Sequence, residues 1–231
     1  MQQTEQELLA DHIQKMGPEL GELFHALSGE LQWLHWRWNE FRALFGEKPS
    51  RIELMNDSAP LFFQVVHDTL FEITLLGVAR FVSPPKSVGK LNLTIQRFCE
   101  PSLFILRPSL SLEISGFVAT AIDASRFAVE WRNRHIAHRD LGLALKRNVK
   151  PLPKTTREMV EKALSALRDV LNQIEQRYCD STTAYSFSVS PWGAENLLTV
   201  IRDGLLREQD RRARWDREEV QEDDMKPLPP I

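Results

Sequence analysis

The chain has 231 residues with a formal net charge of -3; 42% of the residues are hydrophobic and 26% are charged. This composition supports one sizeable core and excludes a protein that is basic overall, so any contact with nucleic acid must come from a local basic patch. The two cysteines, Cys99 and Cys179, lie far apart without metal-ligand spacing, which favours a reducing compartment over a disulfide framework. The polar, acidic N-terminal segment is unlike a signal peptide, and the longest apolar run, residues 71–82, is too short to span a bilayer. We therefore expect a cytoplasmic protein without a membrane segment.

A long helix is predicted from about residue 18 to residue 45, after a shorter helix over about residues 5–16. Gly17 and Pro18 mark its beginning, and Gly46 marks its end. Apolar residues spaced alternately by four and three keep one face of this helix apolar, as in a bundle helix that faces a common core. A dimerising coiled coil is the alternative. The stripe consists of Leu20, Phe24, Leu27, Leu31, Leu34, Trp38, Phe41 and Phe45.

A second long helical segment is predicted over about residues 51–81. Pro60 should kink it or mark a restart after Ser58. Two prolines then end it, residues 86–92 read as a loop, and residues 93–100 form at most a short helix. The expected inner positions are Ile52, Met55, Phe62, Val66, Ile73 and Leu76.

A third long helix is predicted from near Ser109 to residues 140–142. On its polar face, Glu130 lies four residues from both Arg126 and Arg134, so these side chains can pair. A basic loop with two prolines follows. The expected inner stripe is Leu110, Ile114, Phe117, Ala121, Ala124, Ala128 and Trp131.

A fourth helix is predicted to begin with a capping box formed by Thr155 and Glu158. Residues 185–190 alternate like a short strand, and Ser190 and Pro191 are typical of the start of a last helix. These elements predict an all-α up-and-down bundle in a single domain over residues 1–222, with a core at about 18–180, a C-terminal helical extension at 190–222 and a disordered tail at 223–231.

The segment from Arg132 to Asp140 is the strongest candidate for chemistry, because it holds three arginines and two of the six histidines at the polar end of a core helix. A guanidinium suits phosphate oxygens, and an imidazole can take or give a proton near neutral pH. Together they are sufficient for RNA cleavage without a metal or another cofactor. Helical geometry puts Arg132 and His138 about 120° apart, so the two converge if the helix loosens near Ile136.

Simpler interpretations of the same segment remain open. An Arg/His cluster at a helix end is often a solvated C-terminus, where cations favour the helix dipole. Asp140 could pair with Arg139 or cap locally. His135 and His138 could ligate a metal with Asp140, but no second ligand pair lies nearby, so we predict no metal site.

The segment resembles the motif of the HEPN superfamily, in which an arginine is followed directly by a polar residue and, a few residues on, by a histidine. Here these are Arg132, Asn133 and His138, with five residues between the arginine and the histidine. The runs at 34–45 and at 92–94 resemble the phage abortive-infection branch of that superfamily. The resemblance covers roughly residues 20–180.

The resemblance implies a HEPN-like four-helix bundle, usually a homodimer whose two motifs face each other across a cleft. It implies a metal-independent endoribonuclease of a toxin–antitoxin or antiphage system, with RNA as substrate and a cognate antitoxin protein as a possible partner. The alternative is an inactive HEPN-like dimer that binds RNA or a protein. Some members carry, two residues past the histidine, a tyrosine that an antitoxin nucleotidylates; here that position is Asp140, which puts such silencing in doubt.

The resemblance gives three residues of the segment an expected role in catalysis. Arg132 would hold the phosphate, His138 would perform acid–base chemistry and Asn133 would orient the phosphate or the imidazole. Three further residues of the segment are expected to be auxiliary, and three residues of the basic loop are expected to bind RNA. The auxiliary residues are Arg134, His135 and Asp140, and the RNA-binding residues are Lys146, Arg147 and Lys150.

Overall fold

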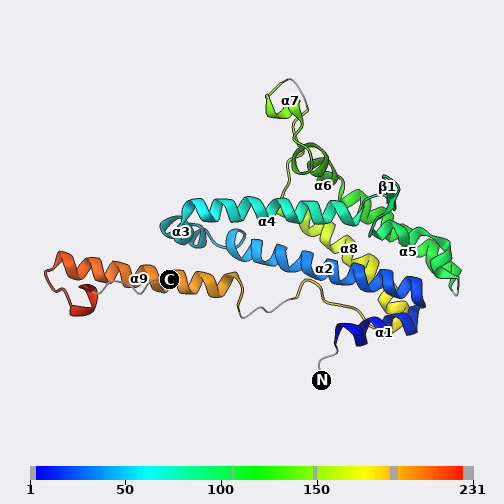
Figure 1. The fold of residues 1–231 in the computed structure, drawn as a ribbon, viewed down its shortest axis with the longest axis horizontal. Helices are drawn as coiled ribbons and strands as arrows, with labels where there is room; N and C mark the ends of the chain where they lie inside the picture. Colours follow the sequence, from blue (N-terminus) through cyan, green and yellow to red (C-terminus); the bar gives the residue numbers. More distant parts are fainter. Residues whose placement is uncertain (1–3, 106, 148–149, 188–191, 226–231) are drawn as a thin grey trace. The chain divides into compact units, whose positions relative to one another are not determined.

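The structure is a computed structural model that describes residues 4–105, 107–147, 150–187 and 192–225. Its described part is almost wholly helical, which confirms the predicted all-α class. Figure 1 shows the helices in chain order. The main helices are α1 (Glu5–Met16), α2 (Pro18–Phe45), α3 (Pro49–Ser58), α4 (Pro60–Phe81), α5 (Pro108–Ala124), α6 (Arg126–Trp131), α7 (Leu141–Ala144), α8 (Arg157–Cys179) and α9 (Ala194–Asp216).

The helices group into two compact units. Unit 1 comprises the described parts of Met1–Asn39 and Thr69–Ser188, and unit 2 those of Glu40–Asp68 and Val189–Ile231. Residues 40–68, which the sequence placed in the core of a single domain, thus group with the C-terminal helical extension. The predicted tail begins with a short 3-10 turn, η4 (Glu222–Met225), and its remainder lies outside the described residues.

The predicted stripe of α2 forms the centre of the core. Its first six residues, from Leu20 to Trp38, are all at most 3% exposed, whereas Phe41 and Phe45 are only partly buried. In unit 1, α2 and α4 approach closely, because a Cβ at Gly77 would lie 2.7 Å from a methyl carbon of Leu34. Burial of this stripe, at about 25 cal/mol per Å² of apolar surface, is a main source of stability for unit 1.

The second helical segment restarts at its proline. Helix α3 ends at Ser58 and α4 begins at Pro60, one of the two outcomes that the sequence allowed. The expected inner position Phe62 is wrong, since its side chain is 59% exposed while Phe63 is buried. After α4, the predicted loop contains a small hairpin of β1 (Lys86–Ser87) and β2 (Lys90–Leu91), joined by Val88 and Gly89, which both have positive φ.

Among the described helices, α4 alone is long and apolar enough to cross a membrane by composition. Its most apolar window of 18 residues has a mean hydropathy of 1.4, and 22% of that window is buried. The apolar segment is therefore longer than the run at residues 71–82 that the sequence pattern indicated. A core helix of a soluble bundle can have the same length and the same apolar composition, so these two properties do not by themselves make α4 a membrane span.

The third helix is broken near its middle. Helix α5 ends at Ala124 and α6 begins at Arg126, with Ser125 fully buried between them. The inner face of α5 includes Val118 rather than the predicted Phe117, which is partly exposed. Helix α5 packs against α8, whose inner face from Val160 to Ile174 is buried.

The N-cap of α8 lies one residue later than predicted. The hydroxyl of Thr156, not that of Thr155, accepts a hydrogen bond from the backbone N–H of Met159, at 3.3 Å. The Thr155 hydroxyl instead lies 3.5 Å from the carbonyl oxygen of Pro153.

Removing this cap gives a paired test of the N-terminus of α8. We expect Thr156→Ala to lower the free energy of unfolding by about 1 kcal/mol, because it leaves an N-terminal N–H of α8 without its cap. Thr155→Ala should cost less than about 0.5 kcal/mol, as an ordinary substitution near the surface does. Urea denaturation of both variants measures the difference, and equal losses would contradict the assignment of the cap.

Residues 184–187 form a turn, in which the backbone N–H of Phe187 donates to the carbonyl of Ala184 at 2.9 Å. The predicted strand is therefore absent from residues 185–187, and residues 188–190 lie outside the described part. Asn172 of α8 makes two hydrogen bonds to the backbone of Thr183. The fully buried Tyr185 shares a hydrogen bond of 2.7 Å with the hydroxyl of Ser28, and burial raises the pKa of Tyr185 to about 12. The predicted Ser190–Pro191 cap also lies outside the described residues, and α9 begins after Gly193.

Candidate functional site

The candidate segment forms a π-helical turn, η3 (Arg132–Ile136), which continues α6 directly. The backbone N–H of Ala137 donates to the carbonyl of Arg132 at 2.9 Å, a bond that spans five residues instead of four. Such turns are rare and occur frequently at functional sites. This turn is the loosening near Ile136 that, by the geometry of a regular helix, would allow Arg132 and His138 to converge.

Arg132 is held by hydrogen bonds on two sides. Its Nε and Nη2 atoms donate to the Oδ1 atom of Asn133 at 2.9 and 2.7 Å. Its Nη1 atom donates to the hydroxyl of Ser83, which follows α4, at 3.0 Å. Asn133 therefore orients the arginine side chain, a contact that differs from the expected positioning of the phosphate or the imidazole, and the guanidinium remains partly exposed.

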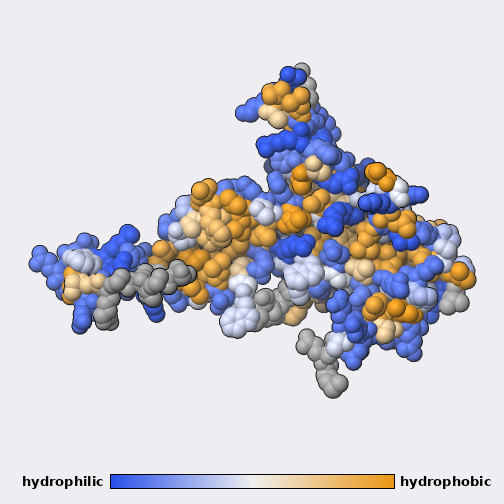
Figure 2. All heavy atoms as spheres, in the orientation of Figure 1, coloured by the Kyte–Doolittle hydropathy of each residue, from blue (hydrophilic) through white to orange (hydrophobic). Residues whose placement is uncertain are grey.

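His138 lies on an exposed bend just after the π-helical turn. Within the described chain, no side chain or backbone group forms a hydrogen bond or ion pair with its imidazole. In Figure 1, the segment from α6 to α7 projects from the rest of unit 1, and Figure 2 shows hydrophilic side chains along it below an apolar tip. An exposed imidazole of this kind is accessible to a large substrate such as RNA.

Arg134 and Asp140 form part of a local ion-pair network. Arg134 donates to Glu130 at 2.9 Å, and its Nε atom lies 3.7 Å from Asp140. It also donates to the carbonyl oxygen of Lys150, which ties the end of the basic loop to the motif. Of the two pairs expected on the polar face of this helix, Glu130–Arg134 is confirmed, whereas Arg126 pairs with Asp123.

His135 packs beside the motif against α4. Its Nε2 atom lies 3.4 Å from a carboxylate oxygen of Glu72, and its ring stands edge-on to Trp131 at 5.4 Å. The Trp131 indole is itself fixed by a hydrogen bond to the carbonyl of Pro153. His135 and His138 thus have different surroundings, and the described residues contain no group of three or more side chains placed to hold a metal ion.

The basic loop adds a short helix that the sequence did not indicate. The carboxylate of Asp140 caps α7 by accepting from the backbone N–H of Leu143, which confirms the alternative of a local capping role. Lys146 and Arg147 are exposed directly after α7. The side chain of Lys150 is 80% exposed, and its amine lies 3.9 Å from a carboxylate oxygen of Glu130. All three predicted RNA-binding residues therefore remain accessible.

Sequence reasoning missed Ser83 and Glu72 as neighbours of the motif. Both belong to the segment of α4 and the turn after it, far from residue 132 in sequence, and neither lies in a recognisable pattern of spacing. The only signal near Ser83 was the pair of prolines that follows it, which marks the end of a helix but names no contact.

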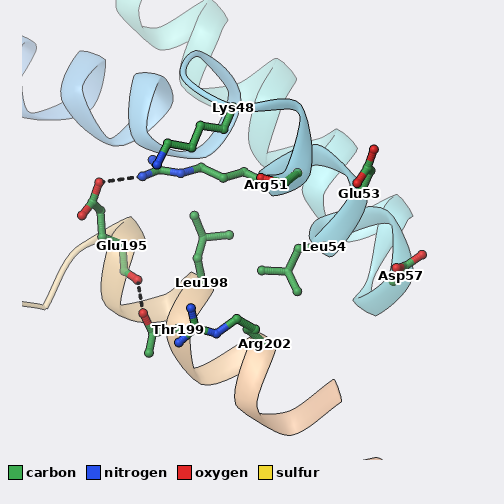
Figure 3. Close-up of a pocket in the computed structure, with 10 residues that line it drawn as sticks. Lys48, Arg51, Glu53, Leu54, Asp57, Glu195, Leu198, Thr199 and Arg202 are labelled. Atoms are coloured by element: carbon green, nitrogen blue, oxygen red, sulfur yellow. Dashed lines mark hydrogen bonds and ion pairs between the residues drawn. The ribbon is translucent and has the colours of Figure 1, made fainter. Parts of the chain in front are cut away.

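Unit 2 holds a separate pocket of about 500 Å³ between α3 and α9. In Figure 3, Arg51 reaches across it to Glu195, while Glu53 and Asp57 point away from it. The Arg51–Glu195 distance is 2.9 Å, and Arg51 also pairs with Glu47 at 3.1 Å. Two carboxylates thus neutralise Arg51, and the other cations that line the pocket are Lys48 and Arg202.

The chain was compared with protein families, with curated proteins and with solved structures. No curated protein and no solved structure matches it. The model of the HEPN family AbiU2 matches residues 17–196, which include the whole segment from Arg132 to His138. The chain therefore belongs to the AbiU2 family of HEPN domains, a family related to abortive infection.

Proposed function

We propose that this protein is a metal-independent endoribonuclease of an antiphage, abortive-infection or toxin–antitoxin system. The proposal rests chiefly on one observation: Asn133 holds Arg132 on a π-helical turn, and the exposed His138, which has no partner within the described chain, lies six residues further on, just after that turn. A guanidinium with a fixed plane suits a phosphate, and an exposed imidazole suits proton transfer.

The proposed reaction uses the ribose 2′-hydroxyl of the substrate as nucleophile. Its oxygen forms a bond to the adjacent phosphorus while a base, His138, removes its proton. The bond from phosphorus to the 5′ oxygen breaks, and that oxygen takes up a proton as it leaves. The products are a 2′,3′-cyclic phosphate and a 5′-hydroxyl, and Arg132 stabilises the negative charge that grows on the phosphate oxygens.

A second copy of the chain would supply the second acid–base group. We propose a homodimer in which His138 of one protomer acts as base and His138 of the other protonates the leaving oxygen. Lys146, Arg147 and Lys150 would contact the phosphates of RNA beside the motif, which makes binding dependent on salt. Regulation by a cognate antitoxin protein belongs to the same proposal, and the protein would act in the cytoplasm.

Incubation of the purified protein with a defined RNA in EDTA tests this function. We expect cleavage to continue in EDTA and to yield fragments with 2′,3′-cyclic phosphate and 5′-hydroxyl ends, because no metal takes part. Fragment ends are identified by enzymatic end-labelling. Fragments with 5′-phosphate ends, or cleavage that stops in EDTA, would contradict the mechanism; RNA binding without cleavage would favour an inactive binding protein.

A further inference from the structure

The guanidinium of Arg132 has only part of its hydrogen-bonding capacity left for a substrate. A guanidinium carries five N–H groups, one on Nε and two on each Nη. Asn133 accepts hydrogen bonds from the Nε–H and from one N–H of Nη2, and Ser83 accepts one from an N–H of Nη1. One N–H therefore remains on Nη1 and one on Nη2, and these two donors are available to the oxygens of a phosphate.

Ser83 is itself held in place by hydrogen bonds to α4 and to Thr94. Its hydroxyl donates to the carbonyl of Ala79 in the last turn of α4, at 2.9 Å, and so presents a lone pair to Arg132. Its own carbonyl lies 2.8 Å from the hydroxyl of Thr94, which also lies 2.7 Å from the carbonyl of Phe81. Thr94 is fully buried. The acceptor that faces Arg132 is therefore held in place by hydrogen bonds of its side chain and of its backbone.

The turn after the hairpin completes this support. The side chain of Asn92 donates to the carbonyl of Pro84 at 2.7 Å, and Gln96 donates to the carbonyl of Val82 at 2.7 Å. The carbonyls of residues 81–84 thus each lie within hydrogen-bonding distance of a side chain from residues 92–96, and those of Phe81 and Ser83 share the single hydroxyl proton of Thr94. This arrangement gives a physical role to the run at 92–94, which the sequence singled out only by resemblance.

We propose that Ser83 is a positioning residue for RNA cleavage: with Asn133 it fixes the plane of the Arg132 guanidinium, so that two N–H groups face the scissile phosphate. The proposal rests on the proposed function. Ser83 acts through Arg132 and does not touch the substrate. Because Arg132 stabilises charge that grows in the transition state, a loss of its orientation should lower kcat more than it raises KM.

Kinetics of two substitutions at this position test the proposal. We expect Ser83→Ala to lower kcat about 10- to 100-fold with a smaller change in KM, since it removes a hydrogen bond to a charged group. Ser83→Thr should restore most of the rate, because it keeps the hydroxyl and a residue before proline adopts an extended backbone that suits β-branched side chains. Ser115→Ala in α5 is the matched control and should keep the wild-type rate, because the Ser115 hydroxyl also donates to a helix carbonyl four residues back, that of Ser111, but makes no hydrogen bond to Arg132. Equal kcat for Ser83→Ala and Ser115→Ala, or no recovery with Ser83→Thr, would overturn the proposal.

Nitrogen NMR of the Arg132 guanidinium separates this proposal from the proposed function, because it needs no activity. In the wild-type protein, hydrogen bonds on both sides should slow rotation of the guanidinium and give distinct Nη1 and Nη2 signals. Ser83→Ala should merge or shift them, and Arg132→Lys assigns them by their disappearance. If the wild-type protein cleaves no RNA yet these signals change as expected, the proposed function fails while the positioning of Arg132 by Ser83 stands. Unchanged signals in Ser83→Ala would overturn the positioning role whatever the activity.

Discussion

His138→Ala is expected to lower the rate of RNA cleavage by about 10²- to 10⁴-fold, the usual contribution of a general acid or base. The imidazole is exposed on a bend and has no described partner, so its loss removes no contact on which the fold depends. The variant should therefore bind RNA and unfold like the wild-type protein while its kcat falls. Single-turnover cleavage in EDTA, together with RNA binding by the same protein, measures both quantities.

Two further variants make this result specific. Arg132→Ala should also lower kcat by about 10²-fold or more, because it removes the donors that stabilise the developing charge. His25→Ala changes a histidine of α2 far from the motif in sequence and should retain the wild-type rate. The assignment of the site would be abandoned if His138→Ala and Arg132→Ala both cleaved RNA as fast as His25→Ala.

The fold could be predicted where one periodic pattern dominates a long segment. The alternating spacing from Leu20 to Trp38 allowed only one buried face, and those residues are buried. The prediction failed where neighbouring positions are equally apolar: Phe62 and Phe63 are adjacent, and only packing decides that Phe63 is the buried one. The N-cap of α8 was predicted one residue too early for a similar reason, because Thr155 and Thr156 have the same side chain.

The sequence was enough to locate the candidate site but not to predict its backbone geometry or its contacts. Arg132, Asn133 and His138 lie within seven consecutive residues, so their proximity follows from the chain itself. The π-helical turn has no sequence signal, since it depends on how α6 ends against the loop. Ser83 comes from the end of α4, and its contact with Arg132 arises only when the bundle brings these two helix ends together.

Acid is expected to destabilise the protein through His35 of α2, a buried histidine that the proposed chemistry does not use. Its side chain is 4% exposed, and its Nε2 atom has no hydrogen-bond partner. Burial, with a smaller contribution from the positive charge of Arg168, lowers the pKa of His35 from 6.5 to about 4. The folded protein therefore keeps this imidazole neutral at a pH at which the unfolded chain already binds a proton.

The sign of the effect follows from proton linkage. Above pH 6.5 both states are neutral at His35, so this residue adds no dependence on pH; between 6.5 and about 4 the unfolded state binds the extra proton, and stability falls as the pH falls. At ~1.4 kcal/mol per pKa unit, the loss between pH 7 and pH 5 should reach about 2 kcal/mol. His35→Phe keeps an aromatic ring beside Tyr185, whose ring stacks at 6.0 Å, and removes the titrating group.

Urea denaturation at pH 7 and pH 5 measures this loss directly. The decline in unfolding free energy should be about 2 kcal/mol smaller in His35→Phe than in the wild-type protein. Leu31→Ala, a fully buried neighbour on α2, should lower stability by about 2–5 kcal/mol at both pH values and leave the decline itself unchanged. If the unfolding free energy of His35→Phe declines between pH 7 and pH 5 as steeply as that of Leu31→Ala, the buried imidazole is not the source of the acid sensitivity. A shallower decline in His35→Phe alone would show that a neutral histidine in the core sets a lower pH limit for the folded bundle, independently of the exposed histidine that carries out the proposed chemistry.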